Sequence, residues 1–195
     1  MGFFSQDEVK RKLFHFLILL YIAAYWFLPR ILVLQAMGIL IFAIAVTEAL
    51  RLNNSRLNKW ILNVLGGVHR KEEETQISGL LWTFSGSFFT MLIFQDKNIV
   101  TASLLYLAFG DAVAALVGRR HGKNKILNEK TIEGSIACFA VCFGIGMFFL
   151  DWPLAFWGAL VATSIEVMPW PLNDNFWMPL TSAMVLTSFA KAFLS

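Results

Sequence analysis

Seven long apolar segments run through this sequence and constrain its fold more than any other feature. Each is long enough, or nearly so, to cross the ~30 Å hydrocarbon layer of a bilayer as a helix. The apolar residues surround each segment and do not form a single stripe, which is typical of helices that face lipid or other helices. The predicted spans are approximately 13–28, 31–50, 77–95, 98–117, 132–150, 153–170 and 178–194.

The composition also indicates a membrane protein, because only 15% of the 195 residues are charged, whereas soluble domains contain about 25%. The first segment follows Lys10-Arg11-Lys12 but has no small-residue cleavage site, so we expect a true span and not a signal peptide. We therefore predict an all-α polytopic protein with about seven transmembrane helices, in which residues 1–195 form a single integral-membrane domain.

The basic residues are distributed unevenly between the predicted loops. Thirteen of the sixteen Lys and Arg residues lie before the first span or in the 51–76 and 118–131 loops, and only Arg30, Lys97 and Lys191 lie on the other side. Cytoplasmic loops carry an excess of Lys and Arg. We therefore expect a cytoplasmic N-terminus, an extracytoplasmic C-terminus and, in a prokaryote, a location in the inner membrane.

Ionisable side chains inside the predicted spans need an explanation, because each costs about 2.5–3.5 kcal/mol on insertion scales. Glu48 has a structural explanation, since it can pair with Arg51 one helical turn later. Asp111 has no basic neighbour in the sequence, so we expect it to be functional. All of these residues lie at or toward the predicted cytoplasmic side: His15, Glu48, Asp111, Glu133 and Glu166, with Asp174 in the turn before the last span.

A basic loop that contains glycines follows Asp111. It is not a P-loop, because three residues separate its glycines and Asn124 stands where a Ser or Thr would bind magnesium. Glycines allow close backbone approach, and cationic side chains neutralise phosphate oxygens, although charges that only orient the protein would look the same. The phosphate-binding candidates are Arg119, Arg120, Gly122, Lys123 and Lys130.

The span after this loop begins with a polar turn that predicts an anion site. Thr131 is a suitable N-cap, and a helix N-terminus beside Lys130 would attract phosphate. Glu133 in the first turn would repel phosphate unless magnesium bridged the two groups. An acid, a basic loop and a second acid at one membrane edge therefore indicate phosphoryl transfer at a membrane surface, with the polar chemistry facing the cytoplasm.

Four stretches together resemble the CTP-dependent lipid-alcohol kinases, which include dolichol kinase, phytol and farnesol kinase and the yeast-type CTP-dependent diacylglycerol kinase. This family is distantly similar to membrane CDP-diacylglycerol synthases. One departure is Asn173, where relatives often have Asp. The stretches are Arg11-Lys12-Leu13-Phe14-His15, Gly110-Asp111 through Gly122-Lys123, Lys130-Thr131-Ile132-Glu133-Gly134-Ser135, and Glu166 followed by Asn173-Asp174-Asn175 and Pro179.

The resemblance implies a magnesium-dependent catalytic domain that transfers the γ-phosphate of CTP to a lipid hydroxyl. Asp111 and Glu133, with Asp174, would hold magnesium. His15, Glu48 or Glu166 would be the base, and the sequence does not choose between them. The residues expected to bind the nucleotide and its phosphates are Arg11, Lys12, Gly110, Arg119, Arg120, Gly122, Lys123, Lys130, Thr131, Gly134, Ser135 and Asn175.

Two other functions stay open at this point, a membrane cytidylyltransferase and a non-enzymatic transporter. The expected partners are CTP, a lipid alcohol and the membrane, and no nucleic acid; the lipid's identity and a homo-oligomer are left open. Cys138 and Cys142, four residues apart in an apolar run, are expected to pack and not to bind metal. Residues 58–68 are expected to form a short interfacial helix anchored by Trp60.

Overall fold

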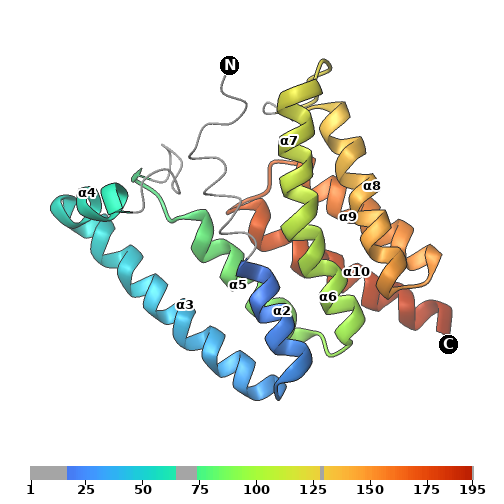
Figure 1. Ribbon diagram of the computed structural model, residues 1–195, viewed down its shortest axis with the longest axis horizontal. Coiled ribbons are helices and arrows are strands. Elements are labelled where there is room, and N and C mark those ends of the chain that lie inside the picture. Colours follow the sequence, from blue (N-terminus) through green and yellow to red (C-terminus); the bar gives the residue numbers. More distant parts are fainter. Residues whose placement is uncertain (1–16, 65–73, 128–129, 195) are drawn as a thin grey trace. The chain divides into compact units, whose positions relative to one another are not determined.

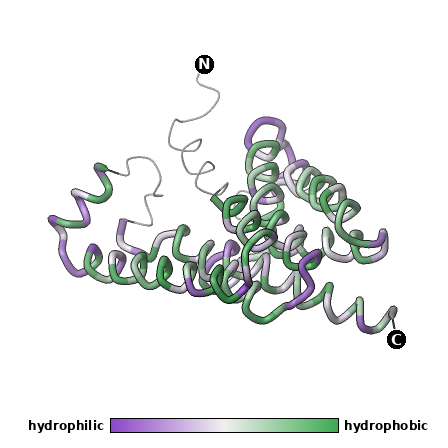
Figure 2. Tube along the Cα trace, turned by 60° about the horizontal axis from the view of Figure 1, so that its bottom comes forward, coloured by the Kyte–Doolittle hydropathy of each residue, from purple (hydrophilic) through white to green (hydrophobic). Residues whose placement is uncertain are grey.

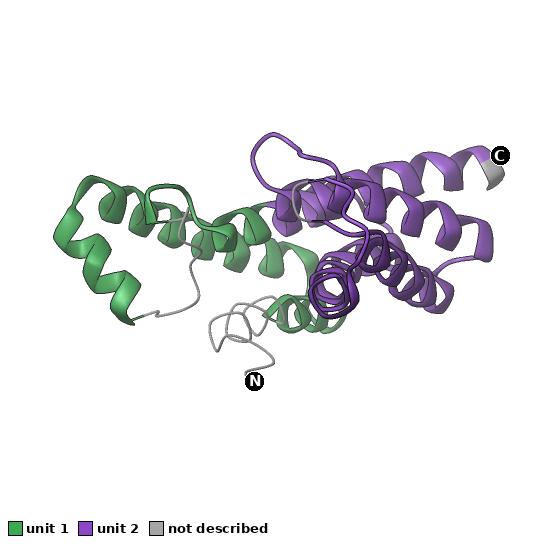
Figure 3. Ribbon diagram, turned by 90° about the horizontal axis from the view of Figure 1, so that it is seen from above, with its two compact units in different colours: residues 1–85 green, residues 86–195 purple. Residues whose placement is uncertain are grey.

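The computed structural model describes residues 17–64, 74–127 and 130–194 (Figure 1). Arg11, Lys12 and His15, three of the residues expected in the site, lie outside this part of the chain. The chain divides into two compact units, Met1–Ser85 and Gly86–Ser195 (Figure 3). The expectation of a single catalytic domain stays a prediction.

The first unit contains two helices that correspond to predicted spans and one short helix. Helix α2 (Leu17–Phe27) is followed at Pro29 by α3 (Arg30–Asn53). Asn54 separates α3 from α4 (Ser55–Val64), and its side chain accepts hydrogen bonds from the first backbone N–H groups of α4. Helix α4 confirms a helix in the described part of 58–68, although it begins earlier, at Ser55; Ile61 is buried and Trp60 is exposed. Its place at a membrane surface stays a prediction.

The second unit is a bundle whose helices pack mostly against their neighbours in sequence. Helix α8 packs against α7 and α9, α9 against α10, and α10 returns to α6. Helix α5 begins in the first unit and ends in the second. The elements are α5 (Gly79–Ile93), α6 (Lys97–Leu105), the π-helix η2 (Tyr106–Gly110), α7 (Asp111–His121), α8 (Ile132–Phe149), α9 (Trp152–Val167) and α10 (Asp174–Leu194).

The all-helical prediction is confirmed, since the described residues contain no strand and each predicted span coincides with a helix or a continuous helical run. Three of these are long and apolar enough to cross a membrane, namely Arg30–Asn53, Lys97–His121 and Ile132–Phe149. Figure 2 shows the helices as mainly hydrophobic and the α7–α8 connection as hydrophilic. The number of spans and the sides of the termini stay predictions.

Candidate active site

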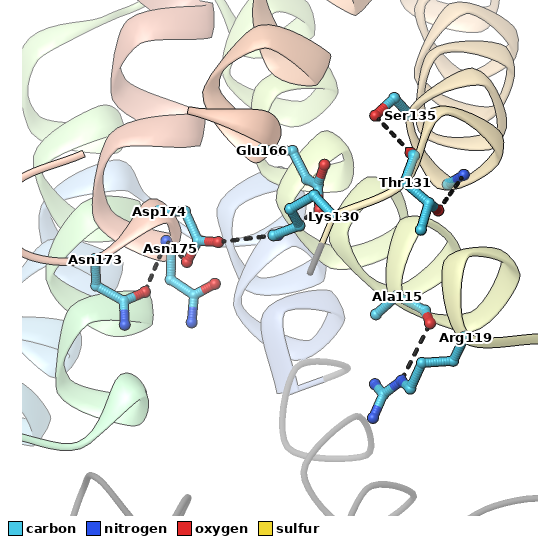
Figure 4. A network of polar contacts seen from close by, with 10 residues as sticks. Ala115, Arg119, Lys130, Thr131, Ser135, Glu166, Asn173, Asp174 and Asn175 are labelled. Atoms are coloured by element: carbon cyan, nitrogen blue, oxygen red, sulfur yellow. Dashed lines mark hydrogen bonds and ion pairs between the residues drawn. The ribbon is translucent and has the colours of Figure 1, made fainter. Parts of the chain in front are cut away.

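The polar centre of the second unit is Lys130, which lies just before α8. Its ammonium group donates a hydrogen bond to Glu166 Oε1 near the end of α9. Its Nζ also lies 3.7 Å from Asp174 Oδ2 at the start of α10. The Glu166 side chain is only 2% exposed, whereas the Lys130 side chain is 31% exposed. A loop and two helix ends therefore bring opposite charges together at one end of the bundle (Figure 4).

Asp111 belongs to the same electrostatic environment. It is buried at the start of α7 and interacts with the charge of Lys130. Burial alone would lower the pKa of Lys130, but the negative charges of Glu166, Asp111 and Asp174 outweigh burial and raise it. Lys130 is therefore a cation at neutral pH. In their ionised forms, three carboxylates around one ammonium leave negative charge that a further cation would neutralise.

A π-helical turn precedes Asp111. The turn η2 (Tyr106–Gly110) joins α6 to α7 within one continuous helical run. Such turns change the direction in which the following side chains point, and they are frequent at functional sites. Gly110 closes the turn against α8: an added Cβ there would lie 2.7 Å from Cys142 Sγ and 3.3 Å from Cys138 Sγ. Both cysteines are buried free thiols, which confirms the packing prediction.

The α7–α8 loop is held by its own hydrogen bonds. The backbone N–H of Gly122 donates to Gly118 O at 2.9 Å, and that of Ile132 donates to Asn124 O at 2.9 Å. Thr131 Oγ1 accepts from the backbone N–H of Gly134 at 3.2 Å, so Thr131 is the N-cap of α8, as predicted. Arg119 and Arg120 lie in the last turn of α7 and not in the loop, and Arg119 Nε donates to Ala115 O at 3.2 Å. Arg120 and the loop residue Lys123 are exposed.

Glu133, in the first turn of α8, contacts the α7–α8 loop. Its carboxylate accepts hydrogen bonds from Asn124 Nδ2 at 3.0 Å and from the Asn124 backbone N–H at 3.4 Å. The adjacent Gly134 packs on α7: an added Cβ there would lie 2.7 Å from Ala114 O and 3.3 Å from Gly118 Cα. Ala114 and Gly118 lie three and seven residues beyond Asp111, or roughly 4.5 and 10 Å along the helix axis.

The three carboxylates predicted to hold magnesium therefore do not form one ligand group. Within the described residues, no group of three or more His, Cys, Asp or Glu side chains could hold a metal ion. Asp111 and Asp174 both act on Lys130, whereas Glu133 braces the loop. Magnesium usually needs only one or two carboxylates in addition to phosphates, so Asp111 with Asp174 still fits the ion.

Glu48 lies in a separate network within the first unit. Arg51 Nε donates to Glu48 Oε1 at 2.9 Å, Arg51 Nη2 donates to Oε2 at 2.6 Å, and the Ser78 backbone N–H donates to Oε2 at 2.9 Å. Arg51 is fully buried and also bonds Gln76 O and Asn58 Oδ1. The structural explanation of Glu48, pairing with Arg51, is therefore confirmed.

The turn before α10 contains a conformation that the sequence did not predict. Leu172 has φ of 72°, in the left-handed region. Asn173 Oδ1 accepts from the backbone N–H of Asn175 at 2.9 Å and so helps to start α10. Asn175 itself is buried. Sequence reasoning named Lys130 and Glu166 but not their contact, because they are 36 residues apart, and it did not identify Leu172.

Comparison with known proteins identifies relatives of this chain. The chain is 30% identical to an uncharacterized protein of Rickettsia prowazekii, over 93% of this chain and 94% of that protein. It is 27% identical to CTP-dependent diacylglycerol kinase 1 of Saccharomyces cerevisiae, over 98% of this chain and 76% of the yeast protein. It is 31% identical to probable phytol kinase 1 of Glycine max, over 49% and 38%. No family model and no solved structure matches the chain.

Proposed function

Because this chain belongs to the family of the CTP-dependent lipid kinases, we propose that it transfers the γ-phosphate of CTP to the hydroxyl of a membrane lipid alcohol in a magnesium-dependent reaction. The named relatives are diacylglycerol and phytol kinases. We therefore propose diacylglycerol or an isoprenoid alcohol as the acceptor. The observation that carries the proposal is the convergence of Asp111, Glu166 and Asp174 on Lys130 beside a basic loop.

Phosphoryl transfer needs charge neutralisation and positioning more than covalent chemistry. We propose that Lys130 contacts the transferred phosphate, because the buried carboxylate of Glu166 holds its ammonium group in place. The exposed Arg120 and Lys123, with Arg119, would bind the other phosphates. Glu166 acts as a positioning residue that orients Lys130.

Asp111 and Asp174 are the proposed magnesium ligands. Carboxylate oxygens suit this hard cation, and both acids act on Lys130, which places them near the proposed phosphate position. When bound, magnesium would neutralise charge on the phosphates. Glu133 instead keeps the α7–α8 loop closed through Asn124, so its effect on magnesium would be indirect.

The three candidate bases are not equally suited. Glu48 accepts from both Arg51 and the Ser78 backbone, so its oxygens already have donors. Glu166 Oε1 already accepts a hydrogen bond from the ammonium group of Lys130. We therefore propose His15, which lies outside the described residues, as the group that accepts the proton of the lipid hydroxyl.

The proposal includes the location of the site. We propose an integral membrane protein, in a prokaryote of the inner membrane, with its active site facing the cytoplasm. The concentration of thirteen of sixteen basic residues on one predicted side supports this orientation.

Labelled CTP tests the function and separates it from the two alternatives. Purified protein would be incubated with magnesium, a panel of lipid alcohols, the corresponding lipid phosphates, and CTP labelled at either the α- or the γ-phosphate. A kinase moves only the γ-label to the lipid and releases CDP. A cytidylyltransferase moves the α-label to a phospholipid and releases pyrophosphate, and a transporter turns over neither. Either of these two results would contradict the proposal.

A further inference from the structure

The connection between α9 and α10 is apolar although it lies beside the polar site. Residues 168–172 read Met-Pro-Trp-Pro-Leu, and the side chains of Met168, Trp170 and Leu172 are exposed, that of Leu172 by 60%. Asp174, two residues later, faces Lys130. The neighbouring 118–131 segment, which comprises the end of α7 and the α7–α8 loop, carries five Lys and Arg residues instead. One end of the bundle therefore presents a basic loop and an apolar loop side by side.

The apolar loop has a fixed conformation. Trp177 Nε1 in the first turns of α10 donates to Pro171 O at 2.6 Å. The rings of Trp170 and Trp177 pack with their centroids 5.9 Å apart. Two prolines restrict the backbone further. These contacts hold Leu172 at φ 72°, a conformation that a leucine adopts only at an energetic cost.

Contact with water does not explain why an exposed leucine is held in the left-handed conformation. An exposed leucine in a strained turn exposes apolar surface and adds backbone strain, so Asn or Gly would suit an aqueous loop better. A lipid surface gives a reason, since it stabilises exposed apolar side chains. Tryptophan is enriched where the hydrocarbon layer meets water. The apolar helix α9, which exposes Trp152, Phe156, Trp157 and Leu160 on one side, leads directly into this loop.

We propose that the 168–172 loop lies in the headgroup layer of the membrane and is the entrance at which a lipid alcohol reaches the site. The acceptor chain passes Trp170 and Leu172, which places its hydroxyl next to Asp174 and Lys130. The role of the loop as an entrance rests on the proposed kinase function, whereas its contact with lipid does not. Two experiments therefore separate the two parts.

The first experiment measures the depth of the loop. Leu172→Cys and the control Lys125→Cys, an exposed residue of the polar loop, are spin-labelled in the full-length protein and reconstituted in phosphatidylcholine–phosphatidylglycerol vesicles. Cys138 and Cys142 are buried, and protein without an added cysteine shows whether they take label. At position 172 we expect high accessibility to oxygen and low accessibility to a water-soluble nickel chelate, and the reverse preference at 125.

Other accessibilities would overturn the contact with lipid. If the label at 172 matched the one at 125, the loop would lie in water. If it were shielded from both oxygen and the nickel chelate, protein would cover it, as in a complex with a second copy of the chain.

The second experiment tests the entrance by kinetics. Leu172→Asn removes the apolar side chain but suits the left-handed conformation, so the fold is not at risk. We expect the KM for a long-chain lipid alcohol to rise at least fivefold while the KM for CTP is unchanged, and Leu172→Met to keep most of the affinity for lipid. A lipid KM within twofold of the natural protein would overturn the entrance. If the natural protein phosphorylated no lipid, the proposed function would fail, and the depth measurement would still decide the contact with lipid.

Discussion

Lys130 joins the start of α8 to the end of α9 and the start of α10 through Glu166 and Asp174. Substitution of Lys130 should therefore lower both activity and stability. Lys130→Met keeps the length of the side chain but leaves the buried Glu166 without its cation. We expect at least a hundredfold loss of kcat/KM, and a loss of stability of about 1.5–3 kcal/mol, the range for hydrogen bonds to charged groups. Turnover of CTP and thermal unfolding in detergent measure the two effects. Lys125→Met, in the same loop, is the matched control, and equal effects of the two variants would contradict the assignment.

The pH dependence of this pair follows from the raised pKa of Lys130. An unfolded lysine titrates near pH 10.4. A group whose pKa is higher in the folded state contributes its full stabilisation below the unfolded pKa, and loses it as the pH rises through the folded pKa. The stability difference between the natural protein and Lys130→Met should therefore be the same at pH 7 and 9 and shrink above about pH 10.4. Unfolding at these pH values tests it, and a difference that already shrinks by pH 9 would contradict it.

Glu48 should matter for stability and not for chemistry. Glu48→Gln removes the carboxylate charge that pairs with the fully buried Arg51, and breaking a buried pair in this way costs about 3–5 kcal/mol. The variant should unfold at a lower temperature, while the folded fraction keeps kcat within about threefold of the natural value. Activity per folded molecule, with the folded fraction measured by size exclusion, checks this. A large fall in kcat of the folded protein would contradict this and would support Glu48 as the general base.

At the scale of elements, the close contact between η2 and α8 depends on Gly110, which has no side chain. Gly110→Ala would place a methyl group 2.7 Å from Cys142 Sγ, and such overpacking costs about 1–3 kcal/mol. Cys142→Ala removes this sulfur, so the double variant should regain most of the lost stability and activity. Gly144→Ala is the control on α8, because an added Cβ there meets nothing within 4 Å. Thermal unfolding of all four variants gives the coupling energy, and zero coupling would mean that the thiol does not set the packing.

The elements also show what the sequence can and cannot predict. Hydropathy located the helices, because apolar runs of this length must be buried or face lipid, and Thr131 marked the start of α8 because its hydroxyl caps the helix. The π-helical turn before Asp111 leaves no comparable pattern in sequence. The Lys130–Glu166 pair depends on how α8, α9 and α10 pack, so neither residue predicts its partner. The hydrogen bond from Asn124 to Glu133 also depends on the conformation of the loop, so the sequence does not predict it.

At the scale of the whole molecule, the orientation in the membrane decides which compartment supplies the nucleotide. Helix α8 (Ile132–Phe149) separates the basic loop from the α8–α9 turn, and its 18 residues span about 27 Å, close to the thickness of the hydrocarbon layer. Lys125 and Asp151, exposed on either side of this helix, should therefore lie in different compartments.

Cysteine labelling in intact cells tests this arrangement. Because basic loops stay in the cytoplasm, a membrane-impermeant maleimide should label Asp151→Cys in intact cells and Lys125→Cys only after permeabilisation. The natural thiols Cys138 and Cys142 are buried and should contribute no background. Labelling of both positions from one side would mean that α8 does not cross the membrane. The reverse labelling pattern would place Lys130 and its carboxylates outside the cell, away from cytoplasmic CTP, and so would contradict a cytoplasm-facing kinase.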